Sequence, residues 1–159
     1  MYKYGDMIYM GEIYIVNNLK EINNLIVGKK KKDILFVEKS YIFKFPFSYI
    51  SVDMLSKLKG PVFRKSFFQL HKAMGIEELI SDRFYRPIRY MGNFKWFYSA
   101  LFGICEKKRI IIYPYLKTEE LPYRIYRLNI LIEYFKKNDY IFIVPIEKGA
   151  DVSCLDYID

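Results

Sequence analysis

The last third of the chain, from Arg109 to Asp159, has the pattern of one strand–helix–strand unit. Residues 109–114 form a short β-branched run that is bounded by charges and closed by proline, which is typical of a strand buried on both faces. Apolar residues then recur at helical spacing and predict a helix with one apolar face: Leu121, Ile125, Leu128, Ile132 and Phe135. Residues 140–144 predict a second buried strand. Two buried strands joined by a helix lie parallel in one sheet, so the sequence predicts an α/β protein.

Both ends of that helix carry signals of their own. Thr118 is a candidate N-cap, and Pro122 falls in the first turn, where its missing N–H does no harm. The run Lys136-Lys137-Asn138 places cations at the negative end of the helix dipole and is predicted to end the helix.

The earlier part of the chain continues the alternation of strands and helices. Strands are predicted over residues 10–16 and 33–38, with a short helix or turn-rich connection between them at 17–26 and a solvated lysine turn at Lys29–Lys32. Helices are predicted over residues 51–58, 63–74, 76–80 and 94–105. The last of these is apolar nearly all round, which indicates a helix buried within the domain.

Composition limits the class of protein. With 159 residues, of which 52% are hydrophobic and 19% aromatic, the chain is predicted to form a single domain over residues 1–159. No apolar stretch approaches the roughly 20 residues that span a bilayer, and acids interrupt the N-terminus where a signal peptide needs an apolar centre. We therefore expect a cytoplasmic protein without membrane insertion. The net charge of +8 leaves a small basic nucleic-acid-binding protein open as the alternative function.

The residues that usually carry catalysis are scarce. His71 is the only histidine, and its place on a helix between Leu70 and Lys72 predicts a surface or boundary position. No phosphate-binding loop of the Walker type and no set of metal ligands is present in the sequence. We expect no catalytic residues, no cofactor and no metal, although a polar cluster assembled across the fold would make the chain an enzyme of another class.

From about Met10 onward the order of segments resembles the later two-thirds of an ATP-binding cassette (ABC) ATPase domain. Each segment matches one conserved passage of that family only in part. Gly92 lies 22 positions before Pro114, which is close to the family's interval between its signature motif and its Walker B proline. Residues 11–15 resemble the strand after the phosphate-loop helix, and residues 34–39 resemble the Q-loop strand. Residues 75–79 and 89–93 resemble the two parts of the signature passage, and residues 110–114 resemble the Walker B strand. Residues 141–146 resemble the strand before the switch histidine, and residues 155–158 resemble the run that follows it.

The resemblance implies a partial P-loop NTPase-like fold, with a mostly parallel sheet flanked by helices, that is truncated at the N-terminus and has lost its active motifs. Lys39 stands where the Q-loop glutamine would be, and Ile146 stands in place of the switch histidine. The signature motif and the Walker B motif are reduced to Gly92, Asn93, Ile112, Tyr113 and Pro114. Isoleucine cannot hold magnesium or steady a phosphate at neutral pH, so the resemblance implies neither ATP hydrolysis nor tight ATP binding.

The same resemblance implies a role in protein–protein interaction. A pseudo-ATPase of this kind would associate with an active ABC ATPase or with the membrane subunit of an ABC transporter, or with a second copy of itself. It would then be cytoplasmic or peripheral at the membrane through that partner. In the family, the Q-loop and signature regions face the partners, so the predicted interface residues are Tyr41, Phe43, Phe45, Phe47, Tyr49, Tyr85, Tyr90 and Met91.

Overall fold

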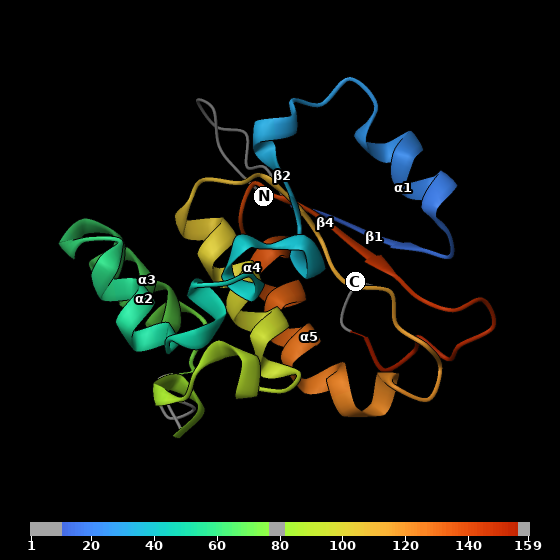
Figure 1. Cartoon of the computed structure of the whole chain (residues 1–159). Helices are drawn as coiled ribbons and strands as arrows, with labels where there is room; N and C mark the ends of the chain where they lie inside the picture. Colours follow the sequence, from blue (N-terminus) through green and yellow to red (C-terminus); the bar gives the residue numbers. More distant parts are fainter. Residues whose placement is uncertain (1–10, 77–81, 156–159) are drawn as a thin grey trace. The chain divides into compact units, whose positions relative to one another are not determined.

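The computed structural model describes residues 11–76 and 82–155, and these residues fall into two compact units (Figure 1). The first unit consists of residues up to Val37 together with those from Lys108 onward. The second unit consists of residues from Glu38 to Lys107. The chain therefore leaves the first unit after its second strand and returns to it before its third.

A parallel sheet forms the centre of the first unit. Its strands are β1 (Glu12–Val16), β2 (Ile34–Phe36), β3 (Ile110–Ile112) and β4 (Ile141–Pro145), in the order β1-β4-β3-β2. All three pairings are parallel, with Glu12 opposite Ile141, Ile110 opposite Ile141 and Ile34 opposite Ile110. The predicted α/β class and parallel arrangement are thus confirmed. Within the described residues, β1 and β2 are the edge strands of this sheet.

Two α-helices of the first unit, α1 (Leu19–Ile26) and α5 (Leu121–Lys136), lie on opposite faces of the sheet (Figure 1). Alternate strand side chains such as Val16, Ile112 and Ile143 pack in one cluster with Ile22 of α1. The intervening side chains point the other way, and the ring of Phe142 lies 4.6 Å from that of Phe135 on α5. This alternation is what the period of two along a strand requires when both faces of the sheet are covered.

Two local details of the first unit differ from expectation. Thr118 does not cap α5, which begins at Leu121 after Glu120; instead both the N–H and the hydroxyl of Thr118 donate to Glu147 Oε2 at 2.8 Å. Strand β2 ends at Phe36, because the chain turns into a short 3₁₀ helix, η2, over Val37–Lys39. The lysine run is exposed as predicted, and it leads into another 3₁₀ helix, η1 (Lys31–Asp33).

The second unit is built from helices. They are α2 (Val52–Leu58), α3 (Pro61–Ala73) and α4 (Phe94–Cys105), together with the 3₁₀ helices η3 (Tyr41–Phe43), η4 (Phe47–Tyr49), η6 (Asp82–Tyr85) and η7 (Ile88–Tyr90). Ser51 caps α2 by accepting from Met54 N at 3.0 Å, and Gly60, at φ +98°, permits the sharp turn into α3. Helix α4 has the predicted bounds, and its residues from Phe97 to Ile104 are all buried.

An aromatic core holds the second unit together. Phe67 on α3 lies within about 6 Å of the rings of Phe84, Tyr98 and Phe102. His71 is part of this core and only 1% exposed, so its predicted surface or boundary position is wrong. The cause is tertiary: one turn of α3 separates His71 from Phe67, and both side chains face α4.

Some predictions fall beyond the described residues. The helix expected over residues 76–80 and most of the family-like passages 75–79 and 155–158 lie in segments 77–81 and 156–159, outside the part that the structure describes. None of the described helices is long and apolar enough to cross a membrane.

Candidate functional site

Parallel sheets of α/β proteins usually bind ligands at the carboxyl ends of their strands. In the first unit, backbone hydrogen bonds connect the carboxyl ends of β1, β3 and β4. Ile146 N donates to Val16 O at 2.8 Å, and Tyr113 N donates to Ile143 O at 2.9 Å. Asn17 Nδ2 adds a bond to Ile146 O at 3.1 Å. A ligand site of the kind usual in α/β proteins would therefore lie at this edge.

Two backbone N–H groups at this edge, those of Asn17 and Thr118, already donate to the chain's own acidic side chains. Glu21 Oε2 accepts from Asn17 N at 2.6 Å, while Glu21 N donates to Asn18 Oδ1 at 2.9 Å, so the start of α1 closes on itself. Thr118 N donates to the Glu147 carboxylate, which lowers the pKa of that group. A phosphate approaching here would meet carboxylates in the positions where it needs donors.

Four of the predicted degenerate positions lie at this edge as buried side chains. Ile112 and Ile146 are covered, and Tyr113 is 2% exposed. Burial raises the pKa of Tyr113, and the charges of Arg124 and Arg127 offset this rise only in part. Pro114 is also buried. The site residues that the resemblance places at the Walker B strand and the switch position therefore pack inside the unit.

The remaining degenerate positions belong to the second unit. Lys39 is exposed in η2, and Gly92, also exposed, has a positive φ of 59°. Asn93 precedes α4 and is exposed, but its side chain makes no capping hydrogen bond to the helix. Among the described residues, no group of three or more His, Cys, Asp or Glu side chains is arranged to hold a metal ion.

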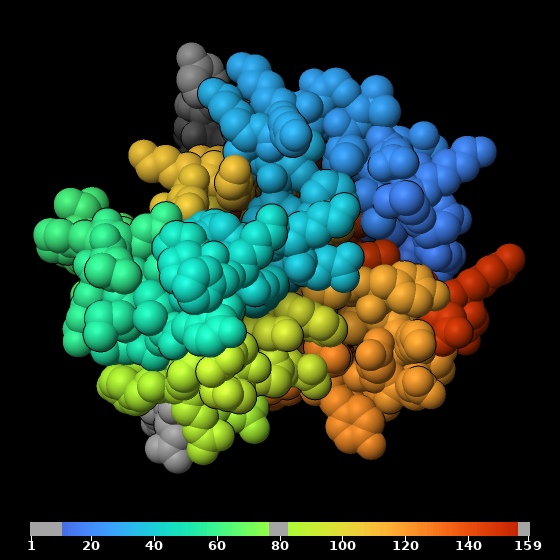
Figure 2. Space-filling model, viewed as in Figure 1, coloured from blue at the N-terminus to red at the C-terminus, as the bar shows by residue number. Residues whose placement is uncertain are grey.

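The two predicted interface segments come together in the second unit. An antiparallel bridge joins Ser51 to Pro87, and Ile88 N donates to Ile50 O at 2.9 Å. These bonds place η4 against η7, although some forty residues separate them in sequence. Figure 2 shows both segments at the surface, residues 41–49 in cyan to teal and residues 85–91 in yellow-green.

Arg89 connects the exposed rings of this surface. Its guanidinium carbon lies 3.9 Å from the ring centroid of Tyr49 and 4.6 Å from that of Tyr90, within the range of cation–π attraction. The ring of Phe45 meets that of Tyr49 edge-on at 5.3 Å. We call Phe45, Tyr49, Arg89 and Tyr90 the aromatic–arginine surface. Phe45, Tyr49 and Tyr90 are 77%, 51% and 61% exposed, so large apolar rings face solvent together.

The other predicted interface residues differ in exposure. Tyr85 is exposed and packs edge-on against Phe84 at 5.1 Å. Tyr41, Phe43 and Phe47 are half-buried, and Tyr41 donates to Glu106 Oε1 at 3.2 Å. Met91 is only 1% exposed, so it supports the surface from inside and offers no contact to a partner.

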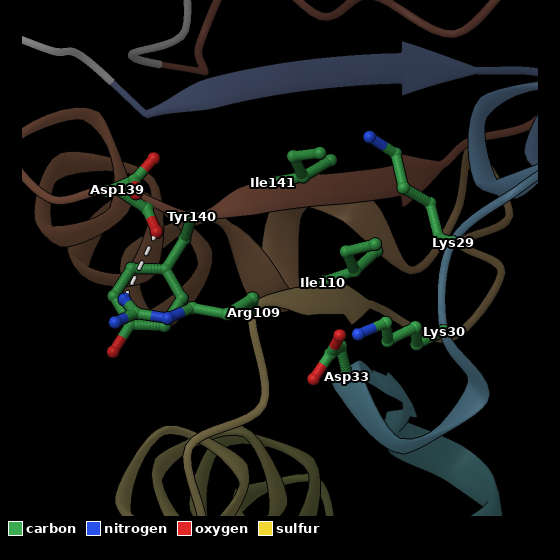
Figure 3. A pocket seen from close by; sticks show the side chains of 8 residues that line it. All are labelled: Lys29, Lys30, Asp33, Arg109, Ile110, Asp139, Tyr140 and Ile141. Atoms are coloured by element: carbon green, nitrogen blue, oxygen red, sulfur yellow. Dashed lines mark hydrogen bonds between the residues drawn. The ribbon is translucent and has the colours of Figure 1, made fainter.

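Two cavities lie near the lysine run of the first unit. The smaller, of about 220 Å³, lies at the amino ends of β3 and β4 (Figure 3). Among its cations, Arg109 donates to Asp139 O at 3.3 Å and lies 5.1 Å from the ring centroid of Tyr140. The carboxylate of Asp33 also lines this cavity. The larger, of about 740 Å³, is an open depression with a different lining: Ile26, Lys29, Lys31, Lys32, Ile34, Phe36 and Lys108.

The sequence identified the aromatic–arginine surface only in part. It singled out both segments as interfaces through their tyrosines and phenylalanines, but it gave Arg89 no role at the centre of the surface. The two cavities were missed, because their linings join residues up to about 110 positions apart and carry no local motif. The only local signal was the lysine run, which as a turn between strands has an ordinary structural explanation.

No family model matches the chain, and no curated protein or solved structure is significantly similar to it. The resemblance to ABC ATPases therefore stays a prediction that rests on the order of the segments.

Proposed function

We propose that this chain is a non-catalytic protein, similar to ABC ATPases in the order of its elements, that acts through protein–protein contacts of its aromatic–arginine surface. Its partner would be an active ABC ATPase or the membrane subunit of an ABC transporter. The observation that carries the proposal is the exposure of Phe45, Tyr49 and Tyr90 around one arginine.

The composition of this surface supports a protein partner. Tyrosine and arginine are enriched among the residues that dominate binding energy at interfaces, and rigid rings lose little conformational entropy on binding. The backbone below them is tied by the Ser51–Pro87 bridge and by the Ile88 N to Ile50 O hydrogen bond. A surface that is ordered before binding avoids part of the entropic cost of association.

The non-catalytic part of the proposal is supported by the carboxyl edge of the sheet. A site of micromolar affinity needs about 8 kcal/mol of net binding free energy, most of which a nucleotide site draws from donors to phosphate and from magnesium. Here Glu21 and Glu147 occupy backbone donors, and Ile112 and Ile146 supply no ligand. We expect no heat from ATP with magnesium in calorimetry of the folded chain.

The interface is tested by photo-crosslinking in the cells that naturally produce the chain. A photoreactive phenylalanine analogue replaces Tyr49 or Tyr90, and a matched variant carries it at Tyr126, an equally exposed tyrosine of α5 in the first unit. We expect cross-links from Tyr49 and Tyr90 to an ABC ATPase or a transporter membrane subunit, and none from Tyr126. Cross-links from all three positions to the same proteins, or none to that class, would refute the proposal.

Binding of single-stranded nucleic acid is the second candidate, favoured by the combination of exposed tyrosines and an arginine. One face of each tyrosine ring is already covered by Arg89, which leaves less area for stacking of bases. Oligonucleotide binding that falls steeply with salt and is lost in Tyr49→Ala and Tyr90→Ala would favour this candidate over the first.

A further inference from the structure

The larger depression of the first unit combines an apolar floor with a rim of one charge. Ile26 at the end of α1 and Ile34 and Phe36 of β2 form the floor. The rim is made of lysines alone: Lys29, Lys31, Lys32 and Lys108. We call this feature the lysine-rimmed depression. Its volume of about 740 Å³ is large enough for several side chains of a bound segment.

Within residues 11–76 and 82–155, the rim lysines are not neutralised by carboxylates. Among the described residues, no carboxylate forms an ion pair with any of them. Lys108 Nζ donates to Lys32 O at 2.8 Å, which holds one ammonium group at the rim, while Lys29, Lys31 and Lys32 are exposed. Several like charges around an apolar floor create a positive potential that attracts an anionic partner.

The smaller cavity provides a contrast within the same region. It shares Lys29 with the depression, yet Asp33 and Asp139 also line it, and Arg109 is engaged by Asp139 O and the Tyr140 ring (Figure 3). Three cations face two carboxylates there, whereas four cations face none in the depression. The anionic partner is therefore expected at the lysine-rimmed depression.

The apolar floor decides which kind of anion fits. A nucleic-acid backbone would use the lysines but leave the apolar floor of Ile26, Ile34 and Phe36 without contacts. A membrane surface would need apolar side chains that protrude, whereas the apolar side chains of the floor lie within the depression. An acidic peptide with an apolar side chain fits both the lysine rim and the apolar floor. Within the part of the chain that the structure describes, β2 is an edge strand, which can pair with an extended chain.

We propose that the lysine-rimmed depression binds an acidic, extended segment of a partner protein, with its carboxylates on the lysines and an apolar side chain on Ile26, Ile34 and Phe36. This surface is separate from the aromatic–arginine surface, and no step of the inference depends on an ABC partner. The two proposals can therefore fail independently.

The test uses the full chain and a fluorescein-labelled peptide of about nine residues, in which glutamates flank one central leucine. We expect saturable binding by fluorescence anisotropy, with a dissociation constant on the order of 10 μM at about 50 mM NaCl and weaker binding at about 300 mM. Replacing the leucine by serine should weaken binding about fivefold or more, since the floor then loses its ligand.

Two charge-matched variants test the place of binding. Lys29→Gln with Lys31→Gln and Lys32→Gln should weaken peptide binding about tenfold or more. Lys20→Gln with Lys117→Gln and Lys148→Gln removes the same charge from lysines that do not line the depression. This variant should change the dissociation constant of the peptide less than about threefold. Circular dichroism verifies that both variants are folded.

Four outcomes would overturn the inference. They are the absence of saturable peptide binding, equal binding of the serine peptide, equal losses in the two variants, and tighter binding of a thymidine oligonucleotide or of phosphatidylserine vesicles that depends on the same three lysines.

Discussion

Lowering the pH from 7 to 5 should destabilise the second unit through His71. The imidazole is 1% exposed and surrounded by the rings of Phe67, Phe84 and Tyr98. Its Nδ1 lies 3.1 Å from Phe67 O, and because a carbonyl oxygen can only accept, Nδ1 carries the proton. Nε2, 3.4 Å from the Tyr98 hydroxyl, then accepts from it. The buried histidine is thus satisfied as a neutral group.

The sign of the effect follows from the pKa. Burial lowers the pKa of His71 from 6.5 to about 4, and the hydrogen bond with Phe67 O opposes this shift only in part. In the unfolded chain the imidazole takes up a proton near its ordinary pKa of about 6.5. Between these values the unfolded state binds more protons than the folded state. The stabilisation is therefore complete above pH 6.5 and is lost as the pH falls toward 4.

The magnitude follows from the same two values. The full shift corresponds to about 3 kcal/mol of unfolding free energy, and about 2 kcal/mol of this should be lost by pH 5. Carboxylates with lowered pKa values, such as that of Asp53, remain ionised over this range. Because the sequence holds a single histidine, no other imidazole contributes.

The assay is urea unfolding at a series of pH values between 7 and 5, followed by the fluorescence of Trp96, the single tryptophan, which lies on α4 of the same unit. His71→Phe is the control: it removes an acceptor from Tyr98 and should lower stability at pH 7, but its unfolding free energy should no longer fall with pH. A flat profile in the native protein, or the same slope in His71→Phe, would refute the assignment.

Three further predictions concern packing and helix ends. Gly11→Ala should lower the unfolding free energy by about 2 kcal/mol or more in urea titration, since its new Cβ would overlap the carbonyl oxygens of Phe135 and Asn138. Gly28→Ala should lower it by only about 1 kcal/mol, because φ is +77° there but no atom lies within 4 Å of the new Cβ. Equal losses in the two variants would contradict the close approach at Gly11. Asp53→Asn should cost about 1 kcal/mol by removing ion pairs to Arg64 at 2.9 Å and Lys57 at 3.1 Å, and a loss that stays the same in about 1 M salt would argue against an electrostatic cause. Ser51→Ala should cost about 1 kcal/mol because Met54 N loses its cap, whereas Ser51→Asp should restore most of this in thermal unfolding.

The secondary structure was predictable where one period dominates. Helix α4 and the buried strands β3 and β4 were recognised because an uninterrupted apolar pattern fixes both the type of element and its burial. The start of α5 was not, since Thr118 is a good cap by type, yet Glu147, 29 residues away, takes its donors. Local helix-capping preference does not decide where a helix begins when a distant side chain offers a stronger, charged hydrogen-bond acceptor.

The candidate sites were predictable only as separate pieces. Aromatic content marked the segments around Tyr49 and Tyr90, but their pairing depends on the Ser51–Pro87 bridge, which no local pattern reveals. His71 was misplaced because burial depends on rings contributed by residues such as Phe84 and Tyr98, which follow it in the chain. Lys108 Nζ donates to Lys32 O at 2.8 Å, although 76 positions separate the two residues in the sequence.

The way in which the fold uses its polar groups explains why neither proposed surface is built from the residues at the carboxyl ends of β1, β3 and β4, the usual ligand edge of a parallel sheet. At that edge the donors and acceptors serve the fold: Asn17 and Thr118 bind the chain's own carboxylates, and Tyr113 is buried. Binding free energy for a partner must come from groups that the fold leaves accessible. Such groups are the rings around Arg89 in the second unit and the lysines around Ile34 in the first. Both proposals of a protein partner rest on these accessible groups.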